Sequence, residues 1–168
     1  MTPAEKEAYA NSDDTRITLY TLELYHPKFK DEDDNEVTLY IVNDNDQLQA
    51  EIDDGSLVNF LPFGFTIRRP PISEEPDPSL SIDVDNVSGF LTPYLDAASR
   101  SGDSIRITFR PYLVDQEEGT VTRLSSLSMI VRNASTTMTA VRLMAAYINP
   151  ANLPFPKETY SSDRFSGL

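Results

Sequence analysis

Hydrophobic and polar residues alternate most regularly in two short stretches in the second half of the chain. In residues 79–85, Leu80, Ile82 and Val84 fall at every second position, with serine or aspartate between them. Since successive side chains of a strand lie on opposite faces, this stretch and residues 104–110 are predicted to be strands with one buried face. The second stretch is expected to point Ile105, Ile107 and Phe109 inward and Arg106, Thr108 and Arg110 outward.

A longer strand is predicted at residues 16–26, which are rich in β-branched and aromatic side chains. Its apolar positions change phase, from Ile17 and Leu19 to Leu22 and Leu24. Such a change predicts either a β-bulge or a strand that is buried on both faces.

The other predicted strands are less regular. Residues 37–42 indicate one strand, and residues 47–60 indicate two that are joined at Gly55, because a tight turn needs the positive φ that glycine adopts easily. Residues 120–132 and 136–148 indicate two more strands, separated by an Asn-Ala-Ser turn.

Two helices are also predicted. The first begins at Thr2, which can cap it, with Pro3 at the first helical position and Glu5 completing a capping box. The second begins at Thr92 and ends at Gly102, since glycine readily closes a helix in the left-handed conformation.

Together these elements predict a mainly β fold. Seven or eight strands, mostly alternating and separated by short turns, favour an antiparallel β-sandwich or barrel with one flanking helix and a short N-terminal helix. Residues 68–78 contain four prolines and are expected to form a long connection. We expect a single domain over residues 1–150, followed by an extended C-terminal arm at residues 151–168.

Composition narrows the classes of function. The net charge of −13 would repel a nucleic-acid backbone and an anionic membrane, whereas it is compatible with a basic protein surface. The chain has no cysteine, which excludes disulfides, thiolate metal sites and cysteine nucleophiles. Because we find neither an apolar run of membrane-spanning length nor a secretion signal, we expect the chain to fold in a cytoplasm, without membrane insertion.

Candidate catalytic and metal-binding residues form weak patterns. His26 has no positioned nucleophile in a recognisable motif, so a structural role at a strand end is the favoured interpretation. Residues 31–42 begin like a calcium-binding EF-hand loop, but Glu36 and Val42 stand where the glycine and the closing glutamate are needed. A solvated acidic loop is the favoured interpretation. A looser calcium site and a glycosidase carboxylate pair are the alternatives. No cofactor is expected.

Two groups of residues are candidate interface contacts. Arg68 and Arg69 lie beside prolines on an acidic background and are expected to form ion pairs with a neighbouring protein. The second group, in a stretch without strand or helix periodicity, is Leu153, Phe155, Tyr160, Phe165 and Leu168. These side chains are expected either to cover a neighbouring subunit, as interface anchors, or to fold back over an edge of their own sheet.

Several stretches resemble a family of short siphophage minor tail proteins that are encoded near the tape-measure and hub genes. The stretches are TPAEKEAYAN, ITLYTLELYHPKF, YIVNDNDQLQAEIDDGSLVNFLPFGFTI, PSLSIDVDNV and FPKETYSSDRFSGL. The last of these differs from the family's usual Phe-Pro-Gly-Leu ending, because Ser166 stands where proline is expected.

The resemblance implies a distal-tail-like component of a phage tail tip, with a tail-tube-like β-sandwich and no enzymatic activity. It implies a homo-oligomeric ring, a trimer or a hexamer, around the DNA channel. The implied partners are the tail tube, the hub and the tape measure, in a virion assembled in the cytoplasm of a bacterial host. A carbohydrate-binding or hydrolytic β-sandwich that uses the acidic loops is the alternative.

Overall fold

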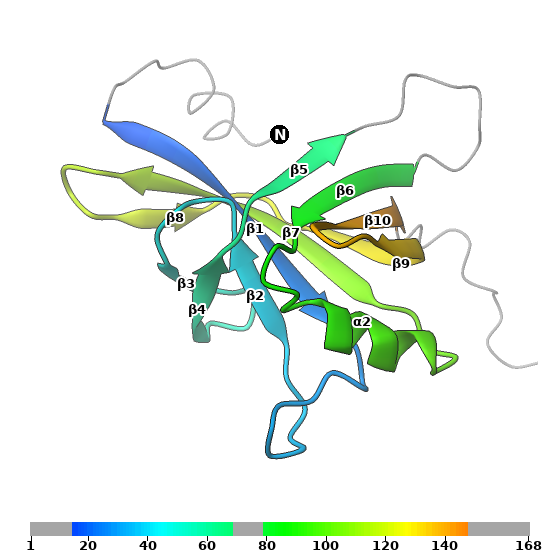
Figure 1. Cartoon of the computed structure of the whole chain (residues 1–168). Helices are drawn as coiled ribbons and strands as arrows, with labels where there is room; N and C mark the ends of the chain where they lie inside the picture. Colours follow the sequence, from blue (N-terminus) through cyan, green and yellow to red (C-terminus); the bar gives the residue numbers. More distant parts are fainter. Residues whose placement is uncertain (1–14, 69–78, 148–168) are drawn as a thin grey trace, which may run out of the picture.

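The computed structural model describes residues 15–68 and 79–147, which form ten strands and one helix (Figure 1). In chain order the elements are β1 (Arg16–Tyr25), β2 (Leu39–Val42), β3 (Leu48–Glu51), β4 (Leu57–Pro62), β5 (Phe65–Arg68), β6 (Ser79–Asp85), α2 (Thr92–Ser99), β7 (Arg106–Asp115), β8 (Val121–Arg123), β9 (Leu127–Thr136) and β10 (Ala140–Tyr147). The predicted N-terminal helix, most of the proline-rich connection, the domain boundary at residue 150 and the C-terminal arm lie outside the described residues.

The strands form one mixed sheet in the order β3-β4-β2-β1-β7-β9-β10-β6-β5, with β8 pairing with β7 outside this path. The prediction of a mainly β fold with a flanking helix is therefore confirmed. The sheet is not closed into a barrel, and one neighbouring pair, β2 with β4, is parallel. The parallel pair arises because β4 forms a hairpin with β3 and then returns beside β2.

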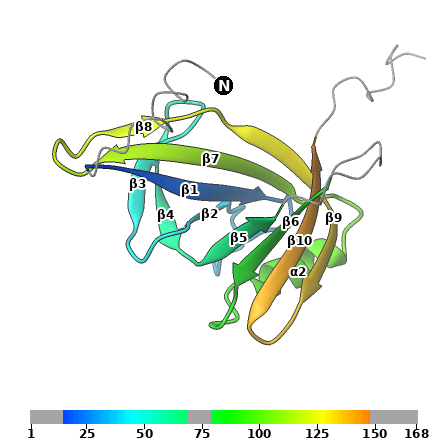
Figure 2. The ribbon, with the colours of Figure 1, turned by 90° about the horizontal axis from the view of Figure 1, so that it is seen from above.

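The sheet is strongly bent, with β6, β9 and β10 at a steep angle to the long pair β1 and β7 (Figure 2). This bend creates the larger of two hydrophobic clusters, which joins Leu22 of β1 and Ile107 of β7 to Ile82 of β6 and Leu143 of β10. The smaller cluster lies around Phe60 and is built from β2, β3, β4 and β7.

Burial on both faces explains the change of phase in β1. Leu22 and Leu24 belong to the larger cluster, whereas Leu19 packs against the smaller one. The pairing of β1 with β7 runs without a shift from Arg16 to Tyr25, so β1 contains no bulge in this ladder. Of the two alternatives, burial on both faces is the correct one.

The same two-sided burial corrects the prediction for β7. Thr108 and Arg110 were expected to face solvent, but they are 7% and 4% exposed. Ile105 and Ile107 are buried on the opposite face, as predicted. The alternation was right, but the second face is covered as well, because the turn between β3 and β4 contacts Arg110 through Asp53.

Helix α2 begins at Thr92, as predicted, with a proline in its first turn. Asn86, just after β6, positions this start: its Oδ1 accepts from the N–H of Leu91 and its Nδ2 donates to Thr92 Oγ1. The predicted end at a left-handed Gly102 is wrong. The helix ends at Ser99, and Arg100 closes it in a right-handed conformation, with the N–H of Ser101 bonded to the Ala98 carbonyl at 3.0 Å.

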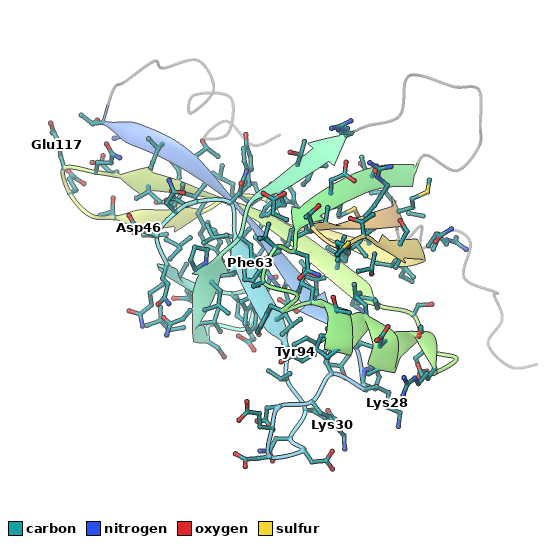
Figure 3. All side chains as sticks on the ribbon, viewed as in Figure 1. Lys28, Lys30, Asp46, Phe63, Tyr94 and Glu117 are labelled. Atoms are coloured by element: carbon teal, nitrogen blue, oxygen red, sulfur yellow. The ribbon has the colours of Figure 1, made fainter. Side chains whose placement is uncertain are left out.

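A row of aromatic rings packs α2 against the rest of the fold. Phe63 contacts Phe90, Phe90 contacts Tyr94, and Tyr94 contacts Phe29, with ring centroids 5.4–5.5 Å apart (Figure 3 labels Phe63 and Tyr94). Leu95 and Ala98 complete the buried face of the helix. Each ring pair contributes about 0.5–1.5 kcal/mol to stability beyond the contribution of its buried area. The row therefore holds the helix against one end of the larger cluster.

Three details of the strand prediction differ from the structure. Residues 120–132 were predicted as one strand, but they contain β8 and the start of β9. The Asn-Ala-Ser stretch lies within β9, and the turn follows at residues 137–139, where Thr137 Oγ1 accepts from the N–H of Ala140. The four-residue strand β5 was not predicted. The hairpin of β3 and β4 was predicted correctly, including Gly55 at φ +85°.

Candidate functional site

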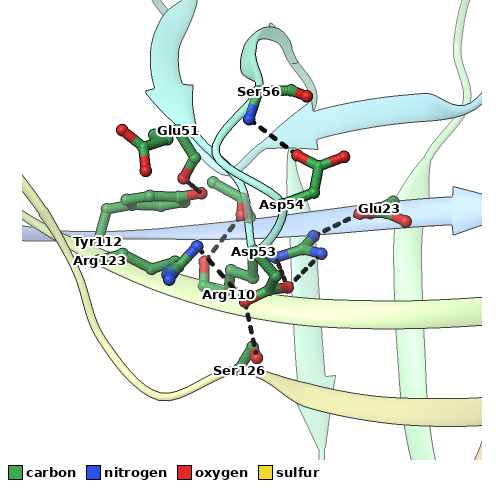
Figure 4. A network of polar contacts seen from close by, with 10 residues as sticks. Glu23, Glu51, Asp53, Asp54, Ser56, Arg110, Tyr112, Arg123 and Ser126 are labelled. Carbon is green, nitrogen blue, oxygen red and sulfur yellow. Dashed lines mark hydrogen bonds and ion pairs between the residues drawn. The ribbon is translucent and has the colours of Figure 1, made fainter.

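The most extensive polar cluster is centred on Arg110 of β7 (Figure 4). Its Nη1 lies 2.5 Å from Glu23 Oε2 on β1, and its Nη2 lies 2.6 Å from Asp53 Oδ2 in the β3–β4 turn. Its backbone carbonyl accepts from Thr21 Oγ1 at 2.8 Å. Asp53 also lies 3.5 Å from Arg123 Nη1 of β8. The guanidinium of Arg110 therefore joins β7 to β1 and to the β3–β4 turn, and Asp53 extends the cluster to β8.

The electrostatics of this cluster suit a permanent ion pair. Burial disfavours the charged guanidinium of Arg110, but its hydrogen bonds to Glu23 and Asp53 outweigh burial and raise its pKa. Burial raises the pKa of the Tyr112 phenol, whose hydroxyl donates to the Glu51 carbonyl. Both shifts move the pKa away from neutral pH, where a general acid or base works best. The cluster is suited to holding the sheet together.

His26 is buried and is hydrogen-bonded as a structural residue. Its Nδ1 accepts from the N–H of Lys28 at 3.0 Å, so the proton of the neutral ring lies on Nε2. Nε2 faces Ser101 Oγ at 3.1 Å and the Asp103 carbonyl at 3.3 Å. A catalytic triad needs the opposite tautomer, with a free Nε2 toward the serine. His26 instead joins the end of β1 to the loop after α2.

In the acidic loop after β1, the carboxylate of Asp31 is hydrogen-bonded by backbone groups of the same loop. Asp31 Oδ1 accepts from the N–H groups of Asp33 and Asn35, and the Asn35 hydrogen bond is the main reason that the pKa of Asp31 is lowered. Lys30 pairs with Asp34 at 2.7 Å. Over residues 15–68 and 79–147, no group of three or more histidine, aspartate or glutamate side chains is arranged to hold a metal ion.

A cavity of about 450 Å³ opens between the two parts of the bent sheet. Its walls come from β1 and β7 on one side of the bend and from β5, β6, β9 and β10 on the other. The main lining side chains are Tyr20, Phe65, Ile67, Phe109, Leu127 and Tyr147. The rings of Tyr20 and Phe109 are stacked at 5.8 Å, and Tyr20 is 37% exposed. Sequence reasoning missed this cavity, because its lining residues come from six strands.

Of the interface residues expected from sequence, the structure describes only Arg68. It lies at the end of β5, with its Nε 3.7 Å from Asp83 Oδ2, and its side chain is 69% exposed. Asp83 is already bonded to Arg142 at 2.6 Å. The other candidates, Arg69, Phe155, Tyr160, Phe165 and Leu168, lie outside the described residues.

A family model described as a domain of unknown function (DUF1833) matches residues 4–160. No curated protein matches the chain. The fold is similar to a solved chain from the virion of a native gene transfer agent (GTA) particle, with a TM-score of 0.52 and 13% identity. That match covers 95% of this chain and 48% of the other, so this chain spans about half of it. The helix that the structure describes, α2, is not long and apolar enough to cross a membrane.

Proposed function

The chain belongs to the DUF1833 family, and we propose that it is a structural protein of a phage-like virion. The observation that carries this proposal is the fold similarity to a chain of a gene transfer agent virion, because it extends over 95% of this chain. In this role the protein acts through contacts with other virion proteins and catalyses no reaction.

The polar groups support an assembly role. Two arginines of the sheet are already paired: Arg110 with Glu23 and Asp53, and Arg142 with Asp83. Ion pairs of this kind help to hold the sheet together, and their charged groups are already engaged with each other rather than positioned to transfer a proton to a substrate. A rigid subunit with satisfied buried polar groups is what repeated assembly into one geometry requires.

We place the protein at the tail tip, as a distal-tail-like ring subunit between the tail tube and the hub. Three or six copies would close around the DNA channel, and the tape measure would be a further neighbour. The sequence resemblance motivates this finer role. The net charge of −13 suits it, because a negative channel wall repels DNA and lets it slide. The exposed Arg68, and Arg69 beside it, would pair with carboxylates of the adjacent subunit.

The competing function, a carbohydrate-binding or hydrolytic β-sandwich, has less support from the described residues. Hydrolysis needs two carboxyl groups that flank a substrate at a defined separation. Glu23 and Asp53 are instead bonded to Arg110, and Asp31 is bonded to its own loop. Thermal stabilisation by sugars or by calcium would favour this competing function.

Quantitative mass spectrometry of purified particles tests the proposal. Particles from a strain that carries an affinity-tagged copy of this chain would be washed in high salt. The amount of the chain in them would then be measured relative to the amount of a known tail-tube protein. We expect the chain at three or six copies per particle. Its absence from washed particles, or a sugar-dependent rise in melting temperature with no particle association, would refute the virion role.

A further inference from the structure

The cavity between the two parts of the sheet has the chemistry of a site for aromatic side chains. The stacked rings of Tyr20 and Phe109 form one wall, and Leu127, Ile67 and Tyr147 continue the apolar lining. Its polar lining includes Asn43, whose Oδ1 is already bonded to the N–H of Phe65 at 3.2 Å. Burial of an aromatic ring here would remove apolar surface of both partners from water.

Three segments of the chain lie outside the described residues, and they differ in what they could offer this cavity. Residues 1–14 contain Met1 and Tyr9 as their large apolar side chains, and residues 69–78 contain only Ile72. Residues 148–168 contain six, namely Ile148, Leu153, Phe155, Tyr160, Phe165 and Leu168. The apolar content thus singles out residues 148–168.

Charge favours the same segment. In residues 148–168, Lys157 and Arg164 balance Glu158 and Asp163, whereas residues 69–78 carry one arginine against three carboxylates. A neutral segment is repelled less by a protein of net charge −13.

The point of attachment makes the segment a close neighbour of the cavity. Tyr147 is the last residue of β10 and itself lines the cavity, so residues 148–168 begin at the cavity wall. Phe155 follows eight residues later and can reach up to about 26 Å at roughly 3.3 Å per residue. A short tether of this kind gives an effective concentration of about a millimolar.

The volume of the cavity also agrees with this occupant. A cavity of roughly 150 Å³ holds one benzene, so about 450 Å³ accommodates two or three rings. The segment supplies three aromatic side chains, Phe155, Tyr160 and Phe165. Its prolines at 150, 154 and 156 lack N–H donors, so side-chain burial suits it better than addition as a strand.

We propose that the cavity lined by Tyr20, Phe109, Leu127 and Tyr147 binds aromatic side chains of residues 148–168 of the same chain. The segment then covers apolar surface of its own subunit. This inference is independent of the virion role, since it concerns the isolated protein.

Cross-linking within the full chain tests the proposal, and the absence of native cysteines makes each introduced pair unambiguous. The test pair is Thr66→Cys, an exposed position on the cavity rim, with Ser161→Cys. The matched control pair is Glu117→Cys, at the exposed turn between β7 and β8, with Ser161→Cys. Ser161 is 14 residues beyond Tyr147, a reach of up to about 46 Å.

With a short bismaleimide at low protein concentration, we expect the test pair to cross-link within one molecule about tenfold faster than the control pair, because binding concentrates the segment at the cavity. Replacing Phe155, Tyr160 and Phe165 together by serine leaves Thr66 and Ser161 at the same positions in the chain, and it should slow the cross-linking of the test pair about tenfold. Equal rates for the two pairs would overturn the proposal. So would products formed only between molecules, at rates that rise with concentration, since these would place the segment on a second copy.

Discussion

The replacement Arg110→Met gives the sharpest test of the buried polar cluster. Methionine keeps a flexible stem of similar packing but removes the guanidinium. Glu23, whose side chain is 17% exposed, would then lose its ion-pair partner. The side chain of Asp53 is 47% exposed, so water would largely replace its lost partner. The expected loss therefore comes mainly from leaving the Glu23 carboxylate poorly solvated and unpaired.

Breaking a buried pair by removing one partner costs about 3–5 kcal/mol. Because Asp53 is half exposed, we expect Arg110→Met to lose about 3 kcal/mol, at the lower end of that range. The double variant Arg110→Met, Glu23→Leu should recover most of this loss, because it removes the stranded charge as well. Arg142→Met is the matched control, since it breaks a 2.6 Å ion pair whose arginine is 61% exposed, and its effect should be much smaller.

Urea unfolding followed by circular dichroism measures these differences. Urea is preferred to guanidinium chloride, which would screen the ion pairs. The interpretation would be refuted if Arg110→Met were no less stable than Arg142→Met, or if the double variant were no more stable than the single one. Either result would mean that the cluster does not hold β1, β7 and the β3–β4 turn together.

Three further predictions concern the sheet and its turns. Leu143→Ala, at a fully buried position, should cost about 2–5 kcal/mol in urea unfolding, whereas the adjacent, 42% exposed Met144→Ala should stay within about 0.5 kcal/mol. In the same assay, Gly55→Ala, at φ +85°, should lower the free energy of unfolding by about 1–3 kcal/mol. Gly102→Ala, with open space around it, should leave that free energy nearly unchanged, and equal effects of the two variants would contradict the assigned turn. The pKa of the Asp115 carboxyl is lowered, mainly by the hydrogen bond from the Glu118 N–H and then by the hydrogen bond from Arg16. The carboxylate therefore contributes its full stabilisation above the usual pKa of 3.8 and loses it as the pH falls through the folded-state pKa. The stability gap between wild type and Asp115→Asn, measured against pH, should therefore narrow below about pH 3.8, and a constant gap would contradict this cause.

Elements with a strict local pattern were predictable from sequence. Leu80, Ile82 and Val84 are buried along β6, as their alternation required, and Thr92 begins the helix where the following proline allows. These two signals depend on neighbouring residues alone, and the rest of the fold does not override them. The mainly β class follows from several such signals together.

Features created by distant segments were not predictable. Arg110 was expected at the surface, since nothing near it in sequence shows that Asp53, 57 residues away, would cover it. The turn between β9 and β10 lies beyond the Asn-Ala-Ser stretch because pairing with β10 extends β9 through Thr136. The C-terminal part of the candidate interface could be predicted only as a set of unpatterned apolar residues. The cavity that we propose for its aromatic side chains is assembled from six strands.

Electron cryomicroscopy of intact tails is the most direct test of the proposal that this chain is a structural subunit of the tail tip. We expect density for three or six copies of the bent sheet with α2 on its flank, arranged around the channel between tube and hub. Tail-tip density filled by other proteins, with tagged copies of this chain absent from it, would refute the proposed role.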